Sequence, residues 1–208
     1  MVDARKYAPA TERNRQPILE VLQQVLPQTG TVLEIASGTG EHATFFAPRL
    51  SHLNWLPSEP DRDSRASVAA WVKALPAKNL MDPLALDVSQ HPWPVEADSL
   101  ALAQPITAIV NINMLHISAW EMCQHLMAGA QRVLPSGGVL YLYGPFKQNG
   151  QQTAPSNAAF DAVLRDRNSQ WGIRDLEAVI EAAQKHDLAL VEVVPMPANN
   201  FSVVFRRM

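Results

Sequence analysis

The 208-residue sequence contains one cysteine, only nine glycines and no long apolar run. The lone Cys123 excludes an internal disulfide and a cysteine-based zinc site, and it is typical of a protein in a reducing compartment. No stretch approaches the ~18 apolar residues that a membrane-spanning helix needs. The polar N-terminus also lacks the apolar segment of a secretory signal. We therefore expect a cytoplasmic protein that does not enter a membrane.

A strong charge of either sign is missing too. The chain has 17 basic and 20 acidic residues, a formal net charge of −3, so no basic surface for general nucleic-acid binding is expected. The six histidines are scattered without the spacing of metal ligands, so no metal site is expected either. The length suits one domain over residues 1–208, and the dispersed tryptophans leave the oligomeric state open.

Short apolar segments alternate with segments of helical periodicity along the chain. Strands are expected at residues 31–36, 53–57, 84–88, 106–112 and 139–143, and helices at 11–26, 40–50, 64–75, 118–134, 157–166 and 173–186. The last two segments, 188–195 and 201–206, have a short connection and should form an antiparallel hairpin. The pattern predicts an α/β fold with a Rossmann-like, open, doubly wound and mostly parallel sheet.

A Gly-rich turn, VLEIASGTGEH at residues 32–42, joins the first strand to the next helix. Because Gly38 and Gly40 have no Cβ, a ligand can approach the backbone N–H groups at the helix start. Residues 38–43, GTGEHA, also satisfy a loose dinucleotide-binding pattern. NAD(P) and S-adenosylmethionine therefore both stay open at this point, as does a tight turn without a ligand.

Acidic residues near the turn favour S-adenosylmethionine over a dinucleotide. Glu34, inside the strand, can hold the loop or meet an ammonium group through water. Glu41, at the helix start, would oppose the like charge of a pyrophosphate. Glu59 and Asp87 follow at the ends of the next two expected strands, where such sheets bind ligands, although each can also be a solvated strand end.

The Gly-rich segment resembles motif I of the class I methyltransferases, with Ala36 in place of the commoner first glycine. LPSEPD at 56–61 and LALDVS at 84–89 are similar to segments near the ends of their second and third strands. The resemblance implies that Glu59 binds the ribose hydroxyls of S-adenosylmethionine, that Asp87 lies beside the adenine amino group and that Val88 backs the ring. The other residues expected to bind the cofactor are Glu34, Ala36, Ser37, Gly38, Gly40 and Asn111.

Five further segments are similar to one family of methyltransferase-like proteins of bacteria and animals, about the length of this chain and long classed as a domain of unknown function. They are YAPATERNRQPIL (7–19), NINMLHIS (111–118), YGPFKQNG (143–150), SNAAFDAVLRDRNSQWGIRDLE (156–177) and MPANNF (196–201). The resemblance covers nearly the whole chain and implies the class I methyltransferase fold. It supplies no substrate.

The candidate catalytic residues follow the strand at 106–112. His116 should face the methyl group in this fold, so we expect it to act as an acid or base or to orient the substrate. A lone histidine can equally be a buried core residue. Asn113 can accept a hydrogen bond from the substrate or from the cofactor's amino group, and Asn111 can instead stabilise the loop backbone.

The N-terminal residues are expected to form a lid over the site. Residues 1–27 are expected to form a helical lid from which Tyr7, Arg13 and Asn14 fold over the cofactor. Tyr143, at the end of a strand, should lie on the rim of the substrate pocket.

Three functions stay open on these observations. The first is an S-adenosylmethionine-dependent methyltransferase that acts on an unidentified small molecule and releases S-adenosylhomocysteine. The second is a non-catalytic cofactor-binding or scaffold protein, since a fold does not establish an activity. The third is an NAD(P)-binding oxidoreductase that would use the same Gly-rich turn.

Overall fold

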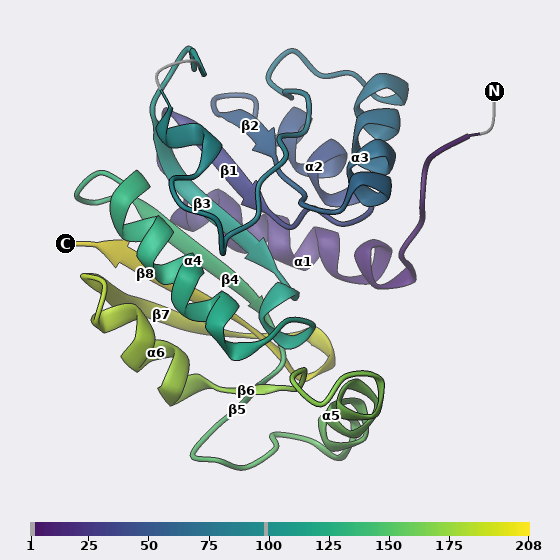
Figure 1. Cartoon of the computed structure of the whole chain (residues 1–208), viewed down its shortest axis with the longest axis vertical. Helices are drawn as coiled ribbons and strands as arrows, with labels where there is room; N and C mark the ends of the chain where they lie inside the picture. The colour runs from purple at the N-terminus through teal and green to yellow at the C-terminus, as the bar shows by residue number, and fades with distance from the viewer. Residues whose placement is uncertain (1–2, 98–99) are drawn as a thin grey trace.

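The computed structural model describes residues 3–97 and 100–208. Its main sheet consists of β1 (Thr31–Ile35), β2 (Asn54–Pro57), β3 (Ile106–Ile112), β4 (Val139–Gly144), β7 (Leu188–Met196) and β8 (Asn200–Arg207). The strand order is β2-β1-β3-β4-β8-β7 (Figure 1). The first four strands run parallel, whereas β8 is antiparallel to both of its neighbours. The expected mostly parallel sheet with a C-terminal antiparallel hairpin is confirmed.

Helices cover both faces of this sheet. Helices α1 (Pro9–Val25) and α2 (Glu41–Phe46) contribute to the core on one face, and α4 (Trp120–Val133) and α6 (Leu176–Gln184) to the core on the other. The remaining helices are α3 (Arg62–Ala74), which packs against α2, and α5 (Pro155–Arg167). Along β1, Val32 enters a core shared with α1 and α2, and the next residue, Leu33, enters a second core shared with α4 and α6. This alternation is what a strand buried on both faces requires.

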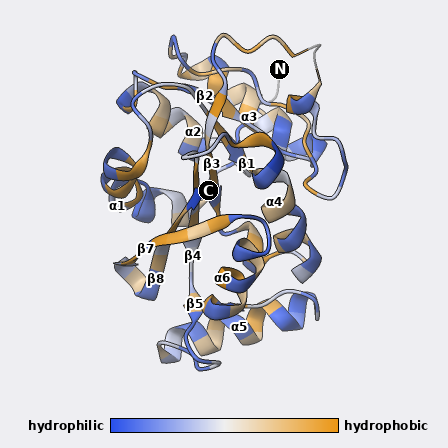
Figure 2. Ribbon diagram, turned by 90° about the vertical axis from the view of Figure 1, so that its left-hand side faces the viewer, coloured by the Kyte–Doolittle hydropathy of each residue, from blue (hydrophilic) through white to orange (hydrophobic). Residues whose placement is uncertain are grey.

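Most of the covering helices are amphipathic, and Figure 2 shows them banded in blue and orange while the edge strand β7 is mostly orange. Within residues 3–97 and 100–208, no helix is long and apolar enough to span a membrane.

The strand expected at 84–88 is wrong. These residues form one isolated bridge, between Ser58 and Leu84. Pro83 comes directly before it and has no N–H with which to continue a ladder along β2. Asp87 consequently lies in a loop and not at the end of a strand.

Two expected helices also differ. The one at 40–50 is split into α2 and a 3₁₀ turn at Ala47–Arg49, where Pro48 cannot donate to the preceding turn. The one at 173–186 starts instead with β6 (Arg174–Asp175), which pairs in parallel with β5 (Phe146–Lys147) before α6 begins. The sequence pattern did not predict this small second sheet.

Candidate functional site

Two cavities open at the carboxyl ends of the parallel strands. The first, of about 430 Å³, is lined by Ala36, Gly38, Glu59, Asp87 and Val88, among others, and we call it the turn cavity. It brings together five residues that sequence reasoning assigned to the cofactor. Glu59 and Asp87 are its only lining residues with ionisable side chains in the part of the chain that the structure describes.

The two glycines of the turn have different roles. Gly38 has a φ of +58°, and a Cβ on it would meet nothing within 4 Å, so its backbone faces open space in the turn cavity. Gly40 has a φ of +94°, and its Cβ would lie 2.7 Å from the Cα of Val68 on α3. Gly38 therefore keeps a ligand path open, whereas Gly40 permits close packing of the turn against α3. Ala36 also has a left-handed φ, of 56°, at the position where the resemblance expects a glycine.

The Glu59 carboxylate closes the turn. Its Oε2 accepts a hydrogen bond from the Gly38 N–H at 2.9 Å, and its Oε1 accepts one from the Asp61 N–H at 3.1 Å. Burial raises the pKa of Glu59, and these two backbone donors offset part of that rise. The carboxylate thus lines the turn cavity while fixing the backbone of the loop.

A loop and not a strand carries Asp87 and Val88. The Asp87 Oδ1 accepts from the Ser89 N–H at 2.9 Å and from the Ser89 hydroxyl at 2.7 Å. Behind this loop, the fully buried Trp93 donates from Nε1 to the Val88 carbonyl at 3.2 Å. Trp93 therefore holds the wall of the turn cavity in the absence of a strand ladder, a role that sequence reasoning missed.

Three residues assigned to the cofactor lie beneath the turn cavity and do not line it. Glu34 is buried, and its Oε2 accepts from Trp55 Nε1 at 2.7 Å. Burial raises the pKa of Glu34 to about 7, although its hydrogen bonds act in the opposite direction. Ser37 exchanges hydrogen bonds with Ser58, and Asn111 donates to the Ile35 carbonyl at 3.0 Å. All three therefore support the backbone of the turn.

The second cavity, of about 700 Å³, lies across the segment that follows β3. We call it the amide cavity, because asparagine side chains from four separate parts of the chain line it: Asn14, Asn113, Asn157, Asn199 and Asn200. Ile117 lines both cavities, whereas Met114 lines only the turn cavity. The segment 113–117 is thus the partition between the two.

Of the expected lid and rim residues, Arg13, Asn14 and Tyr143 line the amide cavity. Tyr7 lines neither cavity; it is 63% exposed and lies edge-on to Trp71, with ring centroids 5.1 Å apart. Later turns of α1 bury Ile18 and other apolar residues in the core, so only the start of this helix borders a cavity.

The loop before α1 is held by Glu41. The Glu41 Oε2 accepts from the Ala8 N–H at 2.6 Å and from the Thr39 hydroxyl at 2.9 Å. It is occupied in joining the N-terminal segment to the Gly-rich turn. Its expected repulsion of a pyrophosphate stays a prediction.

A polar chain leads from the core to the amide cavity. His42 Nε2 lies 2.8 Å from Asn14 Oδ1, and both Asn14 and Tyr143 line the amide cavity. Burial lowers the pKa of His42 to about 3 and raises that of Tyr143, so both are neutral near pH 7. Neutral His42 then donates to Asn14 Oδ1, which leaves the Asn14 amide N–H groups available to a ligand.

His116 lies in the interior, outside both cavities. It is 1% exposed, and its ring stands edge-on to Phe146 at a centroid distance of 5.0 Å. Neither ring nitrogen has a hydrogen-bond partner in the described chain, and burial lowers the pKa of His116 to about 3. The structure therefore places the expected acid or base in the core, the alternative that the sequence left open.

Asn113, in contrast, does line a cavity. It has a left-handed φ of 65°, and its N–H donates to the Tyr143 carbonyl at 2.8 Å. The next residues form a 3₁₀ turn, Met114–His116, which carries the chain back into the core. The reversal at Asn113 is the reason that Asn113 faces the amide cavity while His116 does not.

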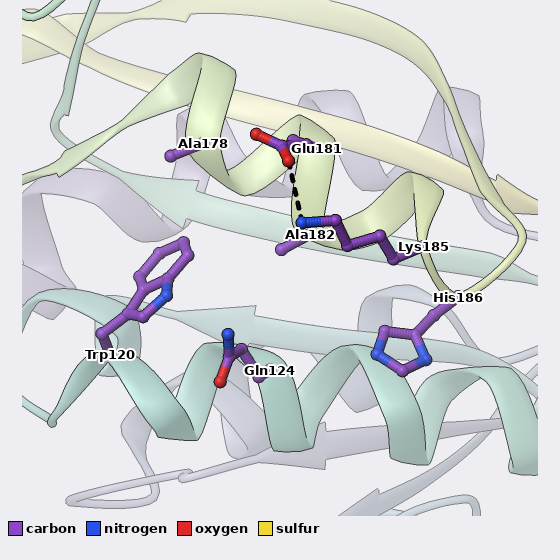
Figure 3. A pocket seen from close by; sticks show the side chains of 7 residues that line it. All are labelled: Trp120, Gln124, Ala178, Glu181, Ala182, Lys185 and His186. Carbon is purple, nitrogen blue, oxygen red and sulfur yellow. Dashed lines mark ion pairs between the residues drawn. The ribbon is translucent and has the colours of Figure 1, made fainter.

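A third hollow lies between α4 and α6 and shares no lining residue with either cavity (Figure 3). Trp120 and Gln124 face Lys185 across it, and Lys185 pairs with Glu181 at 2.8 Å. In the described ranges, no group of three or more His, Cys, Asp or Glu residues is placed to hold a metal ion.

Several solved structures that are similar to this chain are described as methyltransferases. An O-methyltransferase family 2 protein from Planctomyces limnophilus, in complex with apigenin, matches with a TM-score of 0.75 and 18% identity over 96% of this chain and 60% of that chain. An O-methyltransferase family protein from Burkholderia thailandensis matches with a TM-score of 0.78 and 14% identity, over 95% and 57%. CalO1, a methyltransferase in calicheamicin biosynthesis with S-adenosylhomocysteine bound, matches with a TM-score of 0.70 and 16% identity, over 96% and 55%.

These similarities show the fold, which is that of the class I methyltransferases. The chain spans 60%, 57% and 55% of the length of the three structures. A family model also matches residues 5–207, and so covers nearly the whole sequence. The chain therefore belongs to the family described as "Protein of unknown function (DUF938)".

Proposed function

We propose that this protein is an S-adenosylmethionine-dependent methyltransferase that acts on a small molecule and releases S-adenosylhomocysteine. The observation that carries the proposal is the turn cavity itself. Gly38 leaves its backbone open to a ligand there, and Glu59 and Asp87 line the same cavity. The amide cavity lies directly across Ile117 and provides room for an acceptor.

The lining of the turn cavity suits this cofactor better than a dinucleotide. Its two ionisable lining side chains are carboxylates, and no Lys or Arg lines it in the described ranges. A pyrophosphate would meet like charges here, whereas a sulfonium and an ammonium group would be attracted. Val88 and Leu86 give an apolar wall for a base, and Asp87 Oδ2 makes no hydrogen bond within the described chain.

When bound, the cofactor supplies a methyl group activated by a positively charged sulfur. The chain's own contribution is to position the acceptor and exclude water. Asn113 and Ile117 lie on the partition where the two ligands would meet. The buried residues Glu34, Ser37 and Asn111 keep the turn rigid from below.

Calorimetric titration with S-adenosylmethionine, S-adenosylhomocysteine and NAD tests the proposal. We expect heat of binding from the first two and none from NAD. Gly38→Val should abolish binding because its side chain fills the open space before the backbone. Gly137→Val is the matched control, since Gly137 also has a positive φ, of +82°, and open space at its Cβ position. Heat from NAD alone would overturn the proposal in favour of an oxidoreductase.

A non-catalytic cofactor-binding protein is the second candidate. It is favoured by the burial of His116, which removes the expected acid or base from both cavities. Release of S-adenosylhomocysteine in the presence of an acceptor decides between the two. Tight binding with no release across a broad set of acceptors would support the binding protein.

A further inference from the structure

The amide cavity has an unusual set of ionisable groups. Among its described lining residues, only Arg13 and Tyr143 have side chains that can ionise, and none is a carboxylate. Arg13 is exposed on α1 and makes no ion pair or side-chain hydrogen bond with the described chain. A cationic ligand would meet no opposite charge in this cavity, whereas an anion would meet Arg13.

The cavity also presents unused hydrogen-bond donors. Tyr143 lines the cavity and is neutral near pH 7, so its hydroxyl can donate to a ligand there. The Asn113 side chain makes no hydrogen bond within the described residues. The side-chain amides of Asn157, Asn199 and Asn200 instead donate to nearby protein oxygens. Among the described residues, the lining side-chain donors without a protein acceptor are therefore those of Arg13, Asn14, Asn113, Tyr143 and Ser156.

No candidate base reaches this cavity. His42 and His116 are buried and neutral, and His42 uses its Nε2 on Asn14. Glu34 has a raised pKa, but it lies below the turn with Trp55. An acceptor that must lose a proton during the reaction would find no group on the described lining to take it.

We propose that the acceptor is a small planar organic anion that binds in the amide cavity with its negative oxygen between Arg13 and Tyr143. The proposal rests on the proposed function and specifies its substrate class. The side chains of Pro17, Pro145 and Phe160 give flat apolar walls for a ring. An oxygen that is already deprotonated, as in an aromatic carboxylate or an acidic phenol, makes a protein base unnecessary.

The chemistry balances without a proton acceptor. The anionic oxygen uses a lone pair to form the new oxygen–carbon bond, and the methyl–sulfur bond breaks with its electron pair left on sulfur. The negative charge of the acceptor and the positive charge of the sulfonium cancel. The products are a neutral methyl ester or methyl ether and a neutral thioether, and no proton moves.

The test compares ligands of one shape and different charge. Benzoate, benzyl alcohol and benzylammonium are titrated by calorimetry into the protein alone and into the protein saturated with S-adenosylhomocysteine. We expect benzoate to bind at least ~10-fold more tightly than the other two, as a charge-assisted contact would give. Arg13→Gln should remove this preference. Arg62→Gln should keep it, because Arg62 is exposed at the start of α3 and lines neither cavity.

Two results would overturn the inference. The first is equal or tighter binding of benzylammonium, and the second is an unchanged benzoate preference in Arg13→Gln. If S-adenosylhomocysteine binds in either case, the proposed function stands and only the acceptor class is wrong. If S-adenosylhomocysteine does not bind at all, the proposed function fails and this inference fails with it.

Discussion

The Glu59 carboxylate receives a hydrogen bond from the Gly38 N–H at 2.9 Å and so joins the loop after β2 to the turn after β1. Both residues line the turn cavity. One contact therefore sets the shape of the Gly-rich loop and the position of a charge beside it. This dual role makes Glu59 the most direct point at which to separate loop geometry from ligand binding.

Glu59→Ala should weaken S-adenosylhomocysteine binding by about 10-fold or more, because it removes the carboxylate and leaves the Gly38 N–H without its partner. Glu59→Gln keeps an oxygen acceptor for that N–H and should fall between the wild type and Glu59→Ala. Calorimetry measures both affinities. Equal affinities for the wild type and Glu59→Ala would show that the carboxylate contributes nothing to the site.

Gly40→Ala should destabilise the fold more than Gly38→Ala. At Gly40 a Cβ would lie 2.7 Å from the Val68 Cα, so α3 or the turn must move, whereas at Gly38 the space is open. Both positions have a positive φ, which alone costs an alanine about 1 kcal/mol. We expect a total loss of more than about 2 kcal/mol at Gly40 in urea unfolding. A similar loss in the two variants would contradict the tight contact with α3.

Glu34 should make the protein less stable as the pH rises. Its pKa in the folded protein is about 7, against 4.5 without perturbation, so the folded state holds a proton that the unfolded state releases between these values. Glu34→Gln has no such proton and keeps an oxygen for Trp55. The variant should gain about 3 kcal/mol relative to the wild type across this window.

Urea unfolding of the wild type and Glu34→Gln at a series of pH values measures this difference. Glu192→Gln, at an exposed position on β7, is the control and should show no such trend. A constant difference between the wild type and Glu34→Gln from pH 4 to 8 would show that folding does not change the pKa of Glu34.

His116→Phe should preserve cofactor affinity and raise the free energy of unfolding by roughly 1 kcal/mol near pH 7, because it removes two buried nitrogens that have no partner. The pKa of His116 is about 3 in the folded protein and 6.5 without perturbation. The unfolded state therefore binds the proton first, and the wild type loses stability as the pH falls from 6.5 towards 3. The variant should lose less over this range.

The measurement is again unfolding against pH, with His125→Phe as the control because His125 is exposed on α4. Methyl transfer to an identified acceptor should continue in His116→Phe. A complete loss of turnover with intact folding would return His116 to the mechanism and contradict its place in the core.

The turn cavity could be predicted from the sequence because its parts are local. Ala36 and Gly38 belong to one contiguous motif, and Glu59 follows the strand beside it. Asp87, which the resemblance placed beside the cofactor, also lines this cavity, although the strand expected to carry it is a loop held by Trp93. The pattern of apolar residues alone does not show that Pro83 interrupts the ladder, or that the Trp93 side chain supports the loop in place of a ladder.

The amide cavity could be predicted only in part. Arg13, Asn14 and Tyr143 were expected near the site, but Phe160 and Pro197 were not assigned to it. These residues come from α1, β4, α5 and the β7–β8 connection. They line one cavity only because of the way in which these elements pack, which a local sequence pattern does not show. The direction of His116 was equally beyond a local reading, since it follows from the left-handed backbone at Asn113.

The start of α1 borders the amide cavity at Arg13 and Asn14, while its later turns bury Ile18 and Leu22 in the core. Helix α1 therefore contributes both to the hydrophobic core and to the lining of the amide cavity. A compound that binds the first turns of α1 only in the folded protein increases the free energy of unfolding. A rise in melting temperature can consequently identify acceptors from a chemical library before any reaction is known.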